Sequence, residues 1–317
     1  MTICVIHTGG TIGCAATPTG FALCDGLVET ALAELAQSGN VQPGYEMVLA
    51  DPLIDSSQAR VADWNWIAGE IASRHDSFDG FVVIHGTDSM AFSAAALAFA
   101  LEGLEKPVVL TGSMVPLSVE VNDGRGNLVA AMAAAQSATP GVWLQFAGQL
   151  LPGTRVQKRH STAWDAFGAD RQDVAPRAAA DRFQCHSYAA KRIAVMTMTP
   201  GFDPQLLVDL NADAVILRCL GTGNVPGDAE FVAALQGLKA RNMPTLVISQ
   251  CLEGGIVMGT YSAALPLVQA DVIDGRDLTL EAGYAKLMMA LSRFETDAVA
   301  LRAYMTAALA GEISPLP

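Results

Sequence analysis

Two threonine-bearing turns carry the strongest chemical signal in the sequence. The first, His7-Thr8-Gly9-Gly10-Thr11, follows the apolar run 3–6, and the second, His85-Gly86-Thr87-Asp88-Ser89, follows the apolar run 81–84. Each turn presents a hydroxyl beside glycines at the point where a strand-like segment stops. Ligands of open parallel sheets bind just beyond the carboxyl ends of the strands. Two such turns can therefore face one pocket, and their glycines leave backbone N–H groups free to donate hydrogen bonds.

The chemistry that these residues suggest is nucleophilic attack by a threonine. A threonine hydroxyl attacks only when a base takes its proton. Asp88 is adjacent to Thr87, and Lys158 lies in a basic segment with Arg155 and Arg159. Lysine serves as a base when burial or neighbouring cations lower its pKa, whereas Asp88 would raise it. The residues alone leave the sum of these effects open.

Other kinds of catalytic site have no matching motif. The Gly-x-Gly-x-x-Gly pattern fails because Thr8 stands at its first glycine, and Gly-Lys-Ser/Thr is absent, which excludes a P-loop. The sequence also lacks Gly-x-Ser-x-Gly and His-Glu-x-x-His. The five histidines are scattered and the six cysteines have no Cys-x-x-Cys spacing. We expect free thiols in a reducing compartment, and neither a metal nor an organic cofactor.

Composition narrows the class of protein further. The chain has 317 residues, of which 51% are hydrophobic and 16% charged, and its formal net charge is −13. Such a charge repels nucleic acid and anionic lipid surfaces. We find no signal-peptide pattern and no apolar run of the ~18–20 residues that cross a bilayer. These features predict a cytoplasmic protein that binds neither nucleic acid nor membranes.

The elements that position the two turns follow an alternating pattern. In the first half, strand-like runs near 3–7, 46–50, 80–85, 107–111 and 142–146 alternate with helical patterns near 61–75, 89–104 and 122–137. The polar stretch 147–191 loses this rhythm. It resumes with strands near 192–198, 213–217 and 244–249 and helices near 203–211, 228–241 and 279–293. Alternation of this kind predicts βαβ units and parallel sheets.

This layout predicts an α/β protein of two domains. We place the larger N-terminal parallel-sheet domain at 1–175, a linker at 176–191, and a smaller C-terminal α/β domain at 192–317. Thr279 is a candidate N-cap for the helix at 279–293.

The two turns resemble the signature motifs of the bacterial-type L-asparaginases. Those motifs are matched here by Thr8-Gly9-Gly10-Thr11-Ile12 and His85-Gly86-Thr87-Asp88-Ser89-Met90, in the same order. The resemblance extends over essentially the whole chain, with kindred segments at 107–113, 165–167, 221–224 and 250–251. Asp55-Ser56-Ser57 and His160 are more similar to the cytoplasmic type I branch. The family fold is a larger N-terminal and a smaller C-terminal α/β domain, assembled as dimers paired into tetramers.

The resemblance implies a role for each matching residue. Thr11 matches the nucleophile that forms an acyl-enzyme, and Thr87, Asp88 and Lys158 match the set that activates the nucleophile or the hydrolytic water. The implied substrate-binding residues include Ser56 and Asp88, for the α-carboxylate and α-amino groups, together with Ser57 and Gly86. The backbone around Gly10, Thr11, Gly86 and Thr87 would donate to the oxyanion. The implied activity is hydrolysis of L-asparagine to L-aspartate and ammonia, by a homodimer or homotetramer without a cofactor.

Phe21 departs from the family pattern. The family has Gly-Tyr in the loop after the first turn, where this chain has Gly20-Phe21. Phenylalanine keeps the ring but has no hydroxyl to relay a proton, a loss typically worth ~10²–10⁴-fold in rate. The alternative is therefore a catalytically weak amino-acid-binding protein, or an altered-specificity, glutaminase-like member of the fold. An amidotransferase subunit is less favoured, because a first strand at residue 3 leaves no room for an extra N-terminal module.

Overall fold

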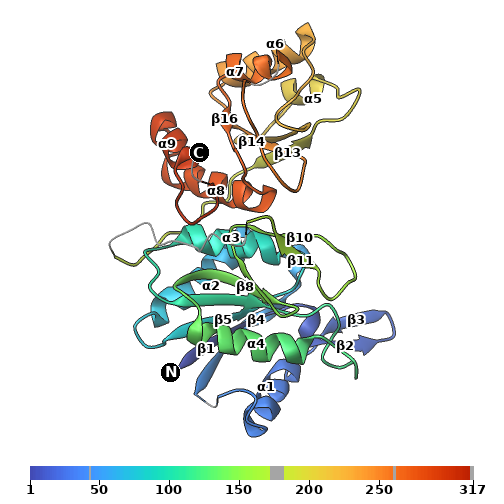
Figure 1. Ribbon diagram of the computed structural model, residues 1–317, viewed down its shortest axis with the longest axis vertical. Helices are drawn as coiled ribbons and strands as arrows, with labels where there is room; N and C mark the ends of the chain where they lie inside the picture. Colours follow the sequence, from blue (N-terminus) through green and yellow to red (C-terminus); the bar gives the residue numbers. More distant parts are fainter. Residues whose placement is uncertain (43, 172–181, 260–261, 315–317) are drawn as a thin grey trace. The chain divides into compact units, whose positions relative to one another are not determined.

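The computed structural model describes residues 1–42, 44–171, 182–259 and 262–314. The chain forms two compact units, Met1–Ser187 and Tyr188–Pro317, which are described separately below (Figure 1). The division falls inside the range predicted as a linker, 176–191, of which residues 176–181 lie outside the described residues. The domain limits given above therefore stay a prediction.

Unit 1 is built on a six-stranded sheet in the order β4-β1-β5-β7-β8-β9. Its strands are β1 (Ile3–Gly9), β4 (Tyr45–Ile54), β5 (Gly80–Ile84), β7 (Pro107–Thr111), β8 (Gly141–Phe146) and β9 (Gln149–Pro152). The first five pair in parallel, and β9 is an antiparallel edge strand. The predicted parallel sheet is confirmed. Every residue of β1, β5, β7 and β8 is buried, which explains why these strands read as continuous apolar runs.

Helices cover both faces of this sheet (Figure 1). They are α1 (Leu27–Gln37), α2 (Val61–Arg74), α3 (Met90–Ala100) and α4 (Gly124–Ser137). Alternate strand residues such as Ile3, Val5 and Val82 form one core with α1 and α4. α1 was not predicted, although its buried residues at 28, 31, 32 and 35 have helical spacing.

The strand order places the two threonine turns at one end of adjacent strands. The connections reverse direction between β1 and β5, because β4 lies on one side of β1 while β5, β7 and β8 extend on the other. Sheets of this order bind ligands in the crevice at that reversal. The first turn follows β1 and the second follows β5.

The described parts of the stretch 147–191, residues 147–171 and 182–191, contain more strands than their composition suggested. They include β9 and three further short strands, β10 (Val156–Lys158), β11 (Phe167–Ala169) and β12 (Gln184–Cys185). β10 pairs with β11, and β12 pairs with the two-residue strand β6 (Leu101–Glu102). Strands of two or three residues lack the repeated alternation that sequence analysis depends on.

Unit 2 has a smaller, four-stranded parallel sheet in the order β13-β14-β15-β16. Its strands are β13 (Ile193–Thr197), β14 (Ala214–Cys219), β15 (Thr245–Ser249) and β16 (Ile273–Asp274). Its helices are α5 (Gln205–Val208), α6 (Ala229–Ala240), α7 (Leu265–Gln269), α8 (Leu280–Arg293) and α9 (Ala298–Thr306). Thr279 is the N-cap of α8 as predicted, since its side chain accepts a hydrogen bond from the Ala282 N–H at 3.1 Å.

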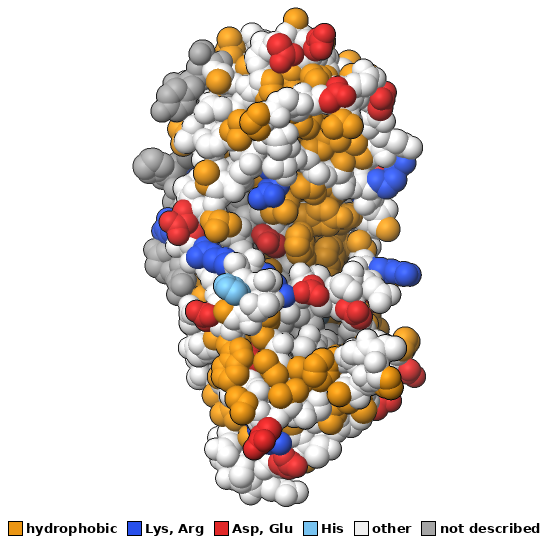
Figure 2. Space-filling view, turned by 90° about the vertical axis from the view of Figure 1, so that its right-hand side faces the viewer, with side chains coloured by type: hydrophobic (Ala, Val, Ile, Leu, Met, Phe, Trp, Pro, Cys, Tyr) orange, Lys and Arg blue, Asp and Glu red, His pale blue; other side chains and the backbone are white. Residues whose placement is uncertain are grey.

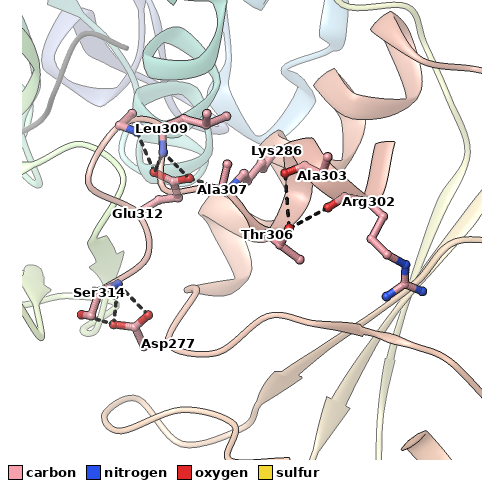
Figure 3. Close-up of polar contacts among 10 residues, drawn as sticks. Asp277, Lys286, Arg302, Ala303, Thr306, Ala307, Leu309, Glu312 and Ser314 are labelled. Atoms are coloured by element: carbon pink, nitrogen blue, oxygen red, sulfur yellow. Dashed lines mark hydrogen bonds and ion pairs between the residues drawn. The ribbon is translucent and has the colours of Figure 1, made fainter. Parts of the chain in front are cut away.

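A buried ion pair holds the C-terminal segment of unit 2. The Lys286 ammonium on α8 donates to Glu312 Oε1 and to the Ala307 carbonyl, each at 2.5 Å. The Glu312 carboxylate also accepts from the N–H groups of Leu309 and Ala310, so it closes the turn after α9 (Figure 3). Both charged side chains are completely buried.

The molecular surface is mixed in character. Figure 2 shows acidic and basic side chains scattered among hydrophobic ones on one face. Among the described residues, no helix is both long and apolar enough to span a membrane.

Candidate active site

The two threonine turns and the Ser56 segment meet through glycines. A side chain added at Gly10, which has φ +92°, would place its Cβ 2.3 Å from the Gly86 Cα. A Cβ added at Gly86 would lie 2.4 Å from Ser56 Oγ. These approaches are too close for any residue but glycine. The structure thus brings the first turn, the second turn and Ser56 together.

Further hydrogen bonds hold the first turn against its neighbours. Thr8 Oγ1 donates to the Ile84 carbonyl at 2.9 Å, which ties the end of β1 to the end of β5. Thr11 is half-buried and begins a short 3₁₀ turn, Thr11–Gly13. The Leu117 N–H donates to the Ile12 carbonyl at 3.2 Å. Thr11 is therefore held on a supported backbone and remains partly exposed to solvent.

Lys158 joins the second turn. Its ammonium donates to Thr87 Oγ1 at 2.9 Å and to Asp88 Oδ1 at 2.8 Å. The antiparallel pairing of Lys158 with Phe167 in the β10–β11 hairpin sets its position. The Lys158 side chain is 21% exposed and that of Asp88 is 62% exposed, so solvent reaches the group. The Thr87–Lys158–Asp88 set predicted by resemblance is thus assembled, over 70 residues of chain.

Arg155 and Arg159, the two cations expected to influence Lys158, have separate environments. Arg155 is completely buried in the turn before β10. Arg159 is exposed and packs over Gly168, where an added Cβ would lie 2.9 Å from a guanidinium nitrogen. Asp88 is a charged group in direct contact with the Lys158 ammonium, at 2.8 Å.

The serines of the 55–58 turn are used differently. Ser56 is buried, and its hydroxyl accepts from the Asp88 N–H at 3.3 Å while its carbonyl accepts from Ser89 Oγ at 2.7 Å. Ser57 is exposed and donates its N–H to Asp55 Oδ1 at 2.9 Å. This bond lowers the pKa of the Asp55 carboxyl. Ser56 is therefore hydrogen-bonded to the second turn, whereas Ser57 stabilises the 55–58 turn itself.

Histidines flank the turns without facing solvent. His7 and His85 are both buried, and desolvation lowers the pKa of each imidazole. His85 contacts the Gly86 carbonyl and the hydroxyl of Ser93 on α3. Sequence reasoning did not find Ser93 or its partner Trp64, because nothing in the sequence distinguishes them from other buried helix residues. His160 lies outside this group, and its Nδ1 accepts from the N–H groups of Thr162 and Ala163.

Phe21 lies on an exposed hairpin. It belongs to β3 (Gly20–Leu23), which pairs with β2 (Cys14–Thr17) so that Phe21 opposes Ala16. Its ring is 56% exposed. Thr17 donates its hydroxyl to the Gly20 carbonyl at 2.6 Å, so that hydroxyl closes the hairpin turn.

A surface pocket of about 580 Å³ lies next to the Ser56 segment. Its lining comes from the end of β3, β4, the 55–60 turn and the start of α2, with Asp55, Arg60 and Trp66 among its side chains. Thr11, Thr87 and Lys158 do not line it. Within the described ranges, no three side chains of His, Cys, Asp or Glu are grouped to hold a metal ion. The candidate site is the edge where the two turns meet, which offers hydroxyl, ammonium, carboxylate and backbone N–H groups.

Known proteins are similar to this chain over nearly its whole length. A family model described as "Asparaginase, N-terminal" matches residues 2–190, and one described as "Glutaminase/Asparaginase C-terminal domain" matches residues 192–305. L-asparaginase 1 of Escherichia coli strain K12 is 34% identical over 332 residues, which cover 99% of this chain and 98% of that protein.

Two further relatives show the range of the similarity. The structure of the thermostable L-asparaginase from Thermococcus kodakarensis superposes with a TM-score of 0.89 at 29% identity, covering all of both chains. The human 60 kDa lysophospholipase is 32% identical over 309 residues, which cover 92% of this chain and 54% of that protein.

Proposed function

We propose, from the premise that this chain belongs to the asparaginase family, that it hydrolyses the side-chain amide of L-asparagine to L-aspartate and ammonia. The observation that carries the proposal is the position of Lys158. Its ammonium contacts both Thr87 and Asp88, on the turn that packs against the Thr11 turn.

Thr11 is proposed as the nucleophile. Its oxygen attacks the carbon of the substrate amide while a base takes the hydroxyl proton. The negative charge that develops on the amide oxygen is stabilised by backbone N–H groups around Gly10, Thr11, Gly86 and Thr87. The C–N bond then breaks, ammonia leaves with a proton, and a β-aspartyl ester remains on Thr11. Water hydrolyses this ester, which releases L-aspartate and restores the hydroxyl.

The Thr87–Lys158–Asp88 set is proposed to move the protons. In the resting arrangement the ammonium donates to Thr87 and Asp88, so Lys158 must give up one proton before it can accept another. The exposure of Asp88 provides a route for that proton to solvent. Thr87 contacts Lys158 and belongs to the turn that packs against the first turn, and it can pass the proton in either direction, since a hydroxyl both donates and accepts.

The substrate's charged end is proposed to bind at Asp88 and Ser56. Asp88 uses Oδ1 for Lys158 and keeps Oδ2 to accept from the α-ammonium. Ser56 accepts from the Asp88 N–H through its hydroxyl oxygen and keeps the O–H proton to donate to the α-carboxylate. Ser57 faces solvent, so it would contact the substrate's α-carboxylate only from the solvent side of the site.

The second candidate is a weak or altered-specificity member of the family. It is favoured by Phe21, which is exposed on the hairpin next to the first turn and has no hydroxyl. The human relative carries the name of a lysophospholipase, so similar chains have been given other activities. In this case L-asparagine would bind with little turnover, or L-glutamine would be the better substrate.

Ammonia release decides between the candidates. Purified protein is assayed with L-asparagine and L-glutamine, with the Thr11→Ala variant as control, and substrate binding is measured by calorimetry. Release from L-asparagine that is lost in Thr11→Ala supports the proposal. Binding of L-asparagine without ammonia release would favour the second candidate.

Assembly and location complete the proposal. We expect a homodimer or homotetramer in the cytoplasm, as the family resemblance implies. Light scattering coupled to size exclusion measures the mass directly, and a monomer at working concentration would contradict this expectation.

A further inference from the structure

A chain of buried hydrogen bonds leads from α2 and α3 to the second turn. The Trp64 indole N–H on α2 donates to Ser93 Oγ on α3 at 3.0 Å. Ser93 Oγ lies 2.9 Å from His85 Nε2, and His85 Nδ1 lies 2.8 Å from the Gly86 carbonyl oxygen. All three side chains are buried, with His85 3% exposed. None of them belongs to the proposed proton-transfer set.

The chemistry of the groups fixes the direction of this chain. An indole N–H only donates and a carbonyl oxygen only accepts. His85 must therefore carry its proton on Nδ1, which donates to Gly86. Burial keeps the imidazole neutral, so Nε2 is bare and accepts the Ser93 hydroxyl proton. The hydrogen bonds run from Trp64 to Ser93, to His85 and to Gly86.

The last bond determines where the Thr87 N–H points. The Gly86 carbonyl and the Thr87 N–H belong to one peptide group, which is planar and trans, so they point in opposite directions. His85 holds the carbonyl toward the interior. The N–H is thereby directed away from the interior, and no group among the described residues accepts a hydrogen bond from it.

We propose that Trp64, Ser93 and His85 are positioning residues that orient the Thr87 N–H as a donor to the oxyanion. This inference rests on the proposed amide hydrolysis. Hydrogen bonds in series polarise one another, so the chain also makes the Thr87 N–H a stronger donor. An oxyanion donor acts in the transition state more than in the ground state, so the chain affects kcat rather than KM.

Two tryptophans provide a matched test. Trp64 is 7% exposed and its indole N–H donates to Ser93 Oγ at 3.0 Å. Trp143, in β8, is 8% exposed and its indole N–H donates to the Thr139 carbonyl at 2.8 Å. Trp64→Phe and Trp143→Phe each remove one buried indole N–H from unit 1. We expect both to lower stability, and only Trp64→Phe to lower kcat, by about tenfold, with KM changed less than twofold. Equal kcat values in the two variants would overturn the proposal.

A spectroscopic arm makes the test independent of turnover. The imidazole ¹⁵N shifts of His85 in the intact protein should show a neutral ring with the proton on Nδ1. The bare Nε2 should shift in Ser93→Ala, where its donor is lost. A proton on Nε2, or a charged ring at neutral pH, would overturn the chain even if the wild type hydrolysed L-asparagine. Conversely, the expected shifts in a protein without amidase activity would leave the chain in place and refute the proposed function.

Discussion

Unit 1 and unit 2 each contain a lysine paired with a carboxylate, in opposite settings. Lys158 lies beside Asp88 at 2.8 Å, with side-chain exposures of 21% and 62%. Lys286 lies beside Glu312 at 2.5 Å, and both side chains are completely buried. The partners of Lys286 are a carboxylate and a carbonyl that only accept, whereas Lys158 also contacts a hydroxyl that can donate or accept.

This difference separates the pair proposed to be catalytic from a structural one. A buried pair with every partner satisfied has no route for a proton and no room for a substrate, so it specifies structure. An accessible pair that touches a hydroxyl can exchange protons. Desolvation lowers the pKa of Lys286 while Glu312 acts against it, so a lysine with a lowered pKa is not by itself a catalytic lysine.

The largest effect should follow from removing either turn hydroxyl. We expect Thr11→Ala and Thr87→Ala each to reduce turnover about 10³-fold or more. The thermal midpoint should change little in Thr11→Ala, because Thr11 is half-buried in a turn, and should fall more in Thr87→Ala, because Thr87 is buried and its hydroxyl accepts from Lys158. Steady-state ammonia release and a thermal melt measure the two quantities. Near-normal turnover in either variant would remove that threonine from the mechanism.

Lysine substitutions test the comparison directly. Lys158→Met should lower turnover at least about 10²-fold, and Lys158→Arg should not restore it, because arginine keeps its proton. Lys286→Met is the matched control, expected to spare kcat in the folded fraction. A fully active Lys158→Arg variant would show that the site needs a fixed positive charge rather than proton transfer.

The buried pair should instead dominate stability. Lys286→Met leaves the Glu312 carboxylate buried without its cation, which typically costs about 3–5 kcal/mol. The double variant Lys286→Met/Glu312→Gln should recover most of that loss, since it removes the unpaired buried charge while the amide oxygen can still accept from the N–H groups of Leu309 and Ala310. Urea unfolding followed by far-UV circular dichroism gives the free energies of unfolding. A double variant no more stable than the single one would contradict this account.

Phe21 sharpens the comparison within unit 1. Phe21→Tyr adds the hydroxyl that the family places in this loop, on a ring that is already exposed. We expect turnover to rise about tenfold, the lower end of what a positioned acid–base group contributes. Phe21→Leu removes the ring without adding a hydroxyl, so it measures what the ring alone contributes to turnover. Unchanged turnover in Phe21→Tyr, with an active wild type, would show that another group already moves the proton.

The smallest effect concerns pH, and its sign differs between two buried histidines of unit 1 and two buried carboxyl groups of unit 2. His7 and His85 of unit 1 have pKa values lowered from 6.5 by burial. Below about pH 6.5 these histidines bind protons in the unfolded chain but stay neutral in the folded chain. Unit 1 therefore loses stability as pH falls. In unit 2, burial raises the pKa of Asp274 and Glu281 above 3.8 and 4.5 respectively. Their folded forms bind protons more tightly, so they stabilise unit 2 as pH falls toward those values.

Tryptophan fluorescence can report unit 1 alone, because all four tryptophans lie before residue 188. Its thermal midpoint should drop between pH 7.5 and pH 5.5, and His85→Asn should reduce the drop. A midpoint that rises on acidification would reverse the sign and refute the buried neutral histidines.

The sequence determined the features that depend on local repetition. Largely apolar runs predicted the buried strands β1, β5, β7 and β8, because a strand covered on both faces has no polar side. Glycine and threonine at their ends located the two turns. The helix at 279–293 and its N-cap followed from spacing and capping chemistry.

Only the tertiary structure decided which of these residues touch. The distance from Lys158 to Thr87 spans 71 positions and depends on a three-residue hairpin with no periodic signal. Trp64, Ser93 and His85 belong to separate segments, and their alignment exists only because α2 and α3 pack side by side. The contrast between Lys158 and Lys286 is likewise set by burial. Hydrophobic pattern is encoded along the chain, whereas the partners and solvation of a polar group depend on residues distant in sequence.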